Sequence, residues 1–224
     1  MGMRGWVLLG MSLAVGWWFS PWSPRVPPAP RIRFSADAAS AHPTNSNPPC
    51  PSPQRVADGA DPLQSPVPAP FPALTVEGMR LEPLAGFSVD ARVLSRRDYR
   101  LGREADVSPT DLALGWGRMR DDRVLSRLVI EQRGRWYRYS WRDRGPPIPS
   151  REIARSSANM HIVPANAAAA ATLARIEAGQ RVRIDGWLVE MAAEDGWRWR
   201  SSLTRDDQGR GACELVYACS ILAE

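Results

Sequence analysis

Four charged residues near the carboxyl end could perform acid–base or phosphoryl chemistry. The stretch SSLTRDDQGRGACELVYA brings Arg205, Asp206, Asp207 and Glu214 together around a glycine-rich turn. Converging carboxylates can hold a divalent cation, and an arginine beside them can stabilise a phosphoryl transition state. A solvated turn whose acidic side chains bond their own backbone explains the same composition without any catalytic role. The turn is the simpler interpretation, and a hydrolase of phosphodiester or similar bonds is the alternative.

His161, in NMHIVP, completes the candidate catalytic set with Arg205, Asp206, Asp207 and Glu214. No Ser or Cys nucleophile can be matched to it by spacing. We therefore interpret it as a hydrogen-bonded structural histidine rather than a general base, with Asn159 and Arg155 as its expected neighbours.

Tryptophan and arginine alternate in RGRWYRYSW and in WRWR. Such strands can stack flat rings and bind anionic groups, as nucleic-acid-binding barrels do. They are equally typical of a small barrel with a tryptophan core and a charged outer face. The candidate ligand-binding residues are Trp197, Trp199, Arg198, Arg200 and Trp116.

The chain has little material for a metal site or a disulfide framework. Its three cysteines are Cys50, Cys213 and Cys219, and His161 is the single histidine beyond residue 80. If Cys213 and Cys219 share one strand, they lie roughly 20 Å apart and cannot pair with each other. We expect no metal and no cofactor, and the sequence leaves the redox state of the cysteines open.

All 29 basic residues are arginine, and the net charge is +5 with a pI near 9.7. An arginine-biased genome explains this choice, although guanidinium groups also suit phosphate or carboxylate recognition. So modest an excess of positive charge is weak evidence for nucleic-acid binding.

The first 22 residues resemble a signal anchor. Arg4 precedes an uncharged, mostly apolar run from Gly5 to Phe19, and the tryptophans at its two ends match the aromatic belts of a spanning helix. No small-residue cleavage site follows the run, which favours an uncleaved transmembrane helix. We expect a bacterial inner-membrane protein with one span and a periplasmic carboxyl-terminal domain, although the arginines on the two sides do not settle the orientation.

Residues 23–80 are predicted to form a Pro-rich disordered linker, because 15 of the 21 prolines lie between Pro21 and Pro72. Motifs such as PVPAPFPA favour extended polyproline II segments with little to bury. The linker would hold a domain of residues 81–224 away from the bilayer.

Within residues 81–224 the pattern alternates short strands with short helices. FSVDARV, NMHIVP, QRVRIDGWLVEM, WRWRSSL and ACELVYACSIL predict strands, and RLVIEQRGRWYRYSW predicts a hairpin turning at Arg133 and Gly134. Helices are expected from Pro109 to Leu114, after Ser150, and in ANAAAAATLARIEAG, which Gly179 would close.

This order of elements predicts an α+β domain, with a small curled antiparallel sheet or an OB-like barrel carrying one or two inserted helices. The strand of QRVRIDGWLVEM would bend at its glycine, as strands do where a small barrel turns a corner.

Four motifs give the chain a resemblance to a family: SPTDLALGWGRM, SSANMHIVPA, VRIDGWLVE and GWRWRSSLTRDDQGRGACEL. Over residues 87–218 it resembles an uncharacterised family of bacterial proteins with one N-terminal membrane segment and a small carboxyl-terminal domain. The resemblance implies an anchored domain and no particular activity.

The expected function is that of a membrane-anchored envelope protein whose small domain binds a ligand or a partner. Outside the cytoplasm nucleic acid is not the expected ligand, whereas cell-wall polymer, lipid head groups or another envelope protein are. Whether the protein is also an enzyme is left open by the sequence, and the phosphodiester hydrolase remains the alternative.

Overall fold

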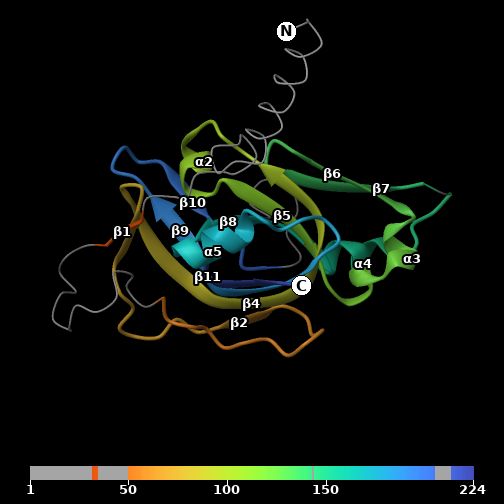
Figure 1. Ribbon diagram of the computed structural model, residues 1–224, viewed down its shortest axis with the longest axis horizontal. Helices are drawn as coiled ribbons and strands as arrows, with labels where there is room; N and C mark the ends of the chain where they lie inside the picture. The colour runs from red at the N-terminus through yellow and green to blue at the C-terminus, as the bar shows by residue number, and fades with distance from the viewer. Residues whose placement is uncertain (1–31, 35–49, 143, 205–212) are drawn as a thin grey trace, which may run out of the picture.

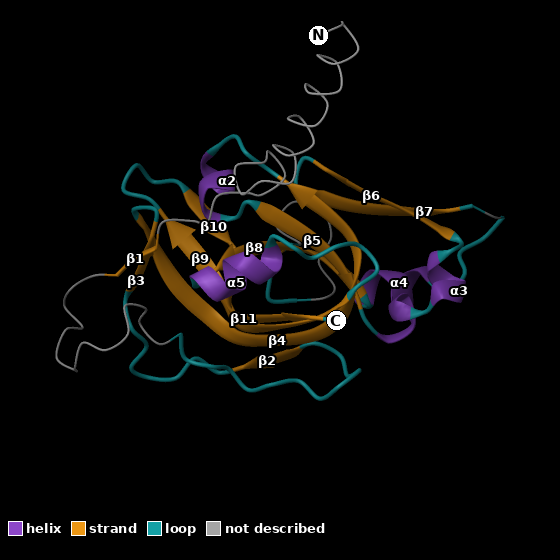
Figure 2. Cartoon of the chain, in the orientation of Figure 1, coloured by secondary structure: helices purple, strands orange, loops and turns teal. Residues whose placement is uncertain are grey.

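The computed structural model describes residues 32–34, 50–142, 144–204 and 213–224, and it is mostly sheet with few helices (Figure 1). Figure 2 shows the strands wrapping into a small curled sheet with the short helices around it. The α+β class and the curled sheet predicted above are therefore confirmed. The strands are β1 (Ile32–Phe34), β2 (Leu63–Ser65), β3 (Leu74–Val76), β4 (Met79–Asp98), β5 (Thr110–Gly115), β6 (Leu128–Arg133), β7 (Trp136–Trp141), β8 (Ser157–Pro164), β9 (Arg181–Ala192), β10 (Arg198–Arg200) and β11 (Glu214–Ala223).

Five strands pair in a closed path. β4 pairs with β5, β5 with β8, β8 with β11, β11 with β9, and β9 returns to β4. All of these pairs are antiparallel except β8 with β11, which is parallel. The remaining strands of this sheet extend the path: β3 and β1 continue from β4, β2 pairs with β4, and β10 pairs with β9. The long β4 and β9 each contribute to the ring and to this extension.

Gly186 allows two strands of the ring to approach closely. A Cβ at this position of β9 would lie 2.1 Å from the carbonyl oxygen of Tyr217 on β11. The pairing of β9 with β11 shifts register between Ala218 and Ser220, next to this contact. The glycine of this strand therefore lies where the chain needs a residue without a side chain, beside an irregularity in the pairing.

Within the described residues, the helices are all short and connect the strands. They are α2 (Arg103–Val107), the 3₁₀ turn η2 (Gly117–Arg120), α3 (Asp122–Leu125), α4 (Ser150–Arg155) and α5 (Ala167–Leu173). Asn166 caps α5 by accepting a hydrogen bond from the amide of Ala169 at 2.9 Å. α5 ends at Leu173, earlier than the glycine at 179 that was expected to close it.

The helix predicted from Pro109 to Leu114 is wrong, because this segment forms β5. Ser108 and Pro109 imitate the start of a helix, but all six residues of β5 are buried between β4 and β8. Burial of residues 110–115 on both faces of the sheet outweighs the local Ser-Pro signal for the start of a helix.

The hairpin predicted in the middle of the chain is confirmed as β6 and β7, which form a separate two-stranded sheet (Figure 2). Its turn lies one residue later than predicted, at Gly134 and Arg135, which have φ of 57° and 65°. Two consecutive positive φ values are typical of the tight turns that match strand twist. The hairpin, with α3, η2 and α4, is inserted between β5 and β8.

Two apolar clusters lie on opposite sides of the ring. The inner cluster includes Phe87, Val89, Leu112, Met160, Ile184 and Val216. The outer cluster includes Trp187, Val189, Met191, Leu215 and Tyr217, and it also contains Leu74, Val76 and the partly buried Phe71 from the segment before β4. A third, smaller cluster beneath the hairpin holds Met119, Leu128 and Ile153.

The segment of residues 50–78 differs from the linker that the sequence suggested. Val56 is buried, and its amide donates to Ser88 Oγ at 2.9 Å. The indole of Trp187 donates to the carbonyl of Pro51 at 2.8 Å, and Phe71 packs edge-on against the same ring. Proline-rich composition did not prevent packing here, because the outer face of the ring offers apolar surface to cover. The rest of the predicted linker, residues 23–49, lies outside the described residues apart from β1.

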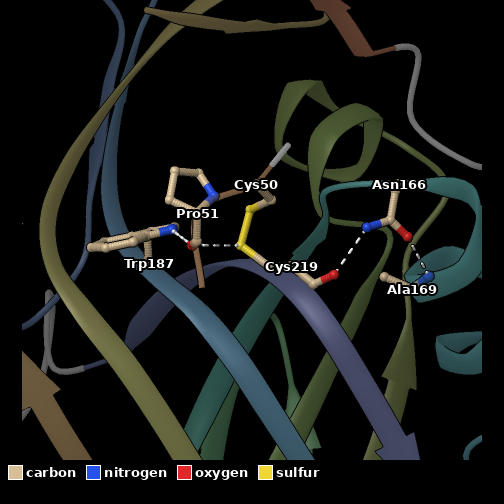
Figure 3. Close-up of a disulfide and its surroundings, with 6 residues drawn as sticks. All are labelled: Cys50, Pro51, Asn166, Ala169, Trp187 and Cys219. Carbon is tan, nitrogen blue, oxygen red and sulfur yellow. Dashed lines mark hydrogen bonds between the residues drawn. A yellow bond between two sulfur atoms is a disulfide. The ribbon is translucent and has the colours of Figure 1, made fainter. Parts of the chain in front are cut away.

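A disulfide joins Cys50 to Cys219 and fixes this segment on the ring (Figure 3). The Cα atoms are 5.5 Å apart and the two cysteines are 169 positions apart in the chain. The sequence excluded a bond between Cys213 and Cys219 but did not identify this pairing. Asn166 also donates to the carbonyl of Cys219 at 2.9 Å, which links the α5 cap to the same point.

The predicted signal anchor of residues 1–22 lies outside the described residues. Within the part of the chain that is described, none of the helices has the length and apolarity needed to cross a bilayer.

Candidate functional site: a polar and aromatic face beside the hairpin

The outer face of β5 and β8 carries a buried polar cluster. Asp111 lies opposite His161 in the register of the two strands, and both side chains are almost completely buried. The Nδ1 atom of His161 is 2.9 Å from Asp111 Oδ1, and the amide of Asn159 donates to Asp111 Oδ2 at 3.2 Å. Strand alternation places these residues on the face opposite Leu112, Met160 and Ile162, which belong to the inner cluster.

Arg135 brings a positive charge to this cluster from the tip of the hairpin. Its Nη1 donates to Asp111 Oδ1 at 2.9 Å and its Nη2 to the carbonyl of Ser108 at 3.0 Å. The guanidinium lies 4.2 Å from the centre of the Tyr99 ring and 5.1 Å from that of Trp199. Burial, and secondarily the charge of Asp111, raises the pKa of Tyr99. The cluster therefore joins an ion pair to two aromatic rings.

Cys213 lies beside the same cluster. Its thiol is 3.8 Å from the carbonyl of Arg135, and the amide of Asn159 is 4.0 Å from its sulfur. Asn159 is held on its other side by Gln132, whose Nε2 donates to Asn159 Oδ1 at 2.6 Å. The predicted proximity of His161 to Asn159 is thus found, with Asp111 as the residue that connects them.

Trp197 and Trp199 form the aromatic part of the face. Their ring centres are 6.2 Å apart, and that of Trp199 lies 4.8 Å from the His161 ring. The guanidinium of Arg103, on α2, lies 5.4 Å from the centre of the Trp197 ring and pairs with Asp195 at 2.5 Å. Both tryptophans are partly exposed and also pack against the outer cluster. Flat rings and guanidinium groups therefore meet at one place on the surface.

Arg198 and Arg200 point to the other side of β10. Both pair with the buried carboxylate of Glu190 on β9, and their own side chains stay more than half exposed. The hydrogen bond from Arg200, followed by that from Arg198, lowers the pKa of Glu190. These arginines therefore form an ion-pair cluster separate from the tryptophan face, although the sequence grouped them with it.

Trp116 is not presented to solvent. It is 1% exposed and belongs to the inner cluster, so it does not offer a ring face for stacking. It forms part of the wall of a cavity of about 470 Å³, which Pro62, Pro149, Arg151 and Arg155 also line.

The structure separates Glu214 from His161. Glu214 is 1% exposed and lies opposite Met160 in the parallel register of β11 and β8, whereas His161 lies opposite Leu215. Because neighbours along a strand point to opposite faces, Glu214 and His161 project to different sides of the sheet. The other predicted catalytic residues, Arg205, Asp206 and Asp207, lie outside the described residues. Among the described residues, no group of three or more His, Cys, Asp or Glu side chains is arranged to hold a metal ion.

A second ion-pair cluster lies at the far end of β9. Arg181 donates from Nε and Nη2 to the buried Asp90 at 2.8 and 2.6 Å, and the amide of Gly59 donates to Asp90 at 2.8 Å. The bond from Arg181 is the main reason that the pKa of Asp90 falls to about 2. This cluster ties residues 58 and 59 to the ring and is structural.

Two residues at the centre of the face were missed by the sequence reasoning. Asp111 falls in a segment predicted as a helix, and Arg135 was considered only as part of a strand that could bind anionic groups, not as the partner of a buried carboxylate. A carboxylate within the otherwise apolar run TDLALGW was the available signal, because a buried charge requires a partner.

Comparisons of the chain with protein-family models, curated proteins and solved structures gave no match. The family resemblance noted from the motifs therefore stays a prediction.

Proposed function

We propose that this chain is a membrane-anchored envelope protein whose barrel is a binding module of the OB type. The support for the OB assignment is the closed path of five strands with α5 between its third and fourth members, β8 and β9. OB barrels bind oligomers on the face of their second and third strands and with the loops that follow the first and fourth. In this chain those strands are β5 and β8, and the connections are residues 99–109 and, as far as the structure describes it, 193–204, which includes β10.

The convergence of Trp197, Trp199, Arg103 and Arg135 at this face is the observation that carries the proposal. Trp197 and Trp199 come from the connection that follows the fourth strand, where Trp199 lies on β10. Arg103 lies on α2 in the connection after the first strand, and Arg135 comes from the inserted hairpin. Indole rings stack on sugar rings or bases, and guanidinium groups pair with carboxylates or phosphates. A cell-wall polymer with sugar rings and free carboxylates fits both groups.

The proposed location is the periplasmic side of a bacterial inner membrane, with the N-terminal segment as a single-pass anchor. The disulfide between Cys50 and Cys219 supports this location, because structural disulfides persist in oxidising compartments. An alkaline phosphatase and a cytoplasm-only fluorescent protein, fused separately after Glu224, test it. Phosphatase activity without fluorescence is expected, and fluorescence alone would contradict the location.

Binding is tested by sedimenting the full chain with purified peptidoglycan sacculi. Substitution Trp197→Ala is expected to reduce the bound fraction about tenfold, since stacking on one aromatic ring contributes roughly 1–3 kcal/mol. Trp141→Ala removes an exposed tryptophan of the hairpin and is the matched control. Equal binding by both variants and the unmodified chain would show that the tryptophan face is not the binding site, and absence of sedimentation would exclude this ligand.

A further inference from the structure

One face of the β6–β7 hairpin carries a row of arginines. The cross-strand register pairs Arg133 with Trp136, Glu131 with Arg138 and Val129 with Ser140. The amide of Arg142 donates to the carbonyl of Arg127 at 3.0 Å, which extends the pairing by one step. Side chains two residues apart on a strand share a face. The hairpin face therefore consists of Arg127, Val129, Glu131, Arg133, Trp136, Arg138, Ser140 and Arg142.

The hairpin face is turned away from the body of the protein. Its members are exposed, apart from the half-buried Val129, and Trp136 is 37% exposed. The alternate residues of the ribbon make the internal contacts instead. Tyr137 donates to Ser157 Oγ on β8 at 3.2 Å, and Leu128 and Tyr139 pack in the cluster beneath the hairpin. Burial raises the pKa of Tyr137 to about 12, in keeping with a ribbon that covers the ring on one side only.

The charge on the hairpin face is unbalanced. Its exposed members include Arg133, Arg138 and Arg142 but a single carboxylate, Glu131, which lies opposite Arg138 in the register. An anionic surface opposite the face would neutralise this excess of positive charge.

We propose that the hairpin face docks on the phosphate groups of anionic phospholipids at the bilayer surface. Arginines bind phosphate through paired N–H donors, and tryptophan favours the headgroup level of a membrane, so Trp136 and its arginine neighbours suit one surface. The face is an extended ribbon, which matches a flat partner better than a small ligand. The apolar run at residues 5–19 predicts that a bilayer lies within reach, and the disulfide supports a compartment without nucleic acid.

Hydrogen exchange of the full chain in lipid nanodiscs tests this docking. Amides of residues 127–142 are expected to exchange about tenfold more slowly in equal parts of phosphatidylglycerol and phosphatidylcholine than in phosphatidylcholine alone. High salt should abolish the difference, because exposed charges are screened beyond a few ångströms at about 1 M. Replacing Arg133, Arg138 and Arg142 by Gln should shift the docking equilibrium roughly a hundredfold and remove the protection.

The matched control replaces Arg80, Arg151 and Arg175 by Gln, which removes the same charge from exposed positions off the hairpin. This control should keep the protection, and both variants should keep the thermal midpoint of the unmodified chain.

Equal exchange in the two lipid mixtures, or equal loss of protection in the two variants, would overturn the proposal. Protection by a single-stranded oligonucleotide but not by the anionic bilayer would show a nucleic-acid surface instead. The sacculus-binding test does not depend on the outcome of this experiment, because the binding it measures is proposed to involve Trp197 and not the hairpin face.

Discussion

Arg135 Nη1 lies 2.9 Å from Asp111 Oδ1, and this ion pair joins the tip of the hairpin to the second strand of the ring. The Asp111 side chain is fully buried and that of Arg135 is 17% exposed. Two charges removed from water are stable only when paired and hydrogen-bonded. The Asp111 carboxylate has further partners in His161 and Asn159, and the Arg135 guanidinium has the carbonyl of Ser108 and the Tyr99 ring. The pair therefore fixes how the inserted hairpin lies over β5 and β8.

Asp111→Asn should destabilise the domain by about 3–5 kcal/mol, because it leaves the Arg135 guanidinium without a counter-ion at a buried position. The free energy of unfolding in urea measures the effect. Asp122→Asn, which removes an exposed carboxylate paired with Arg92, is the matched control and should cost less than about 1 kcal/mol. If the two variants lose equal stability, the pair does not fix the hairpin.

Cys219→Ser should destabilise the domain by about 2–5 kcal/mol and release the segment that begins at Cys50. The disulfide closes almost the whole described chain, so its loss enlarges the unfolded ensemble substantially. Limited proteolysis should then cut between residues 51 and 73, whereas the unmodified protein should resist cleavage there. Cys213→Ser leaves the disulfide in place and should leave the proteolytic pattern unchanged. Cleavage in both variants would show that the bond does not hold the segment.

Acid should weaken the fold through Asp90. Its folded-state pKa of about 2 lies below the ordinary value of 3.8, so between these values the unfolded chain binds more protons than the folded one. The stabilisation is complete above pH 3.8 and is lost as pH falls toward 2. It amounts to about 2 kcal/mol. Asp90→Asn should remove this contribution at neutral pH and flatten the stability curve in that window; an unchanged slope would contradict the assignment.

Gly186→Ala should be strongly destabilising, by about 3 kcal/mol or more, because the added Cβ meets backbone atoms of Tyr217 and Ala218 at less than 3 Å. Backbone in a closed ring has little room to move aside. Gly145→Ala is the control, since a Cβ there meets nothing within 4 Å. The midpoints of thermal unfolding of the two variants are compared. A Gly186→Ala variant as stable as the unmodified chain would show that the backbone of the ring can shift to accommodate the added Cβ.

Period-two patterns predicted most strands correctly, and burial explains where the pattern failed. Phe87, Val89 and Val93 alternate with polar residues, and the strand that contains them was expected. Residues 110–115 show no alternation because both faces are covered, so the Ser-Pro start signal decided the prediction wrongly.

The candidate site was only partly predictable for a different reason. Trp197, Trp199 and His161 stand out by residue type, but their meeting depends on partners far away in the chain. Asp111 is 24 residues from Arg135 and 50 from His161. Side-chain spacing within one strand carries no information about such pairs, and only the ring of strands brings them together.

The bond between Cys50 and Cys219 also determines how the protein carries mechanical load. A pull between the chain ahead of Cys50 and β11 passes directly through the two sulfur atoms. Everything between the two cysteines is a covalent loop, so tension between these two points does not extend it. The ring of strands would therefore stay closed under such a pull.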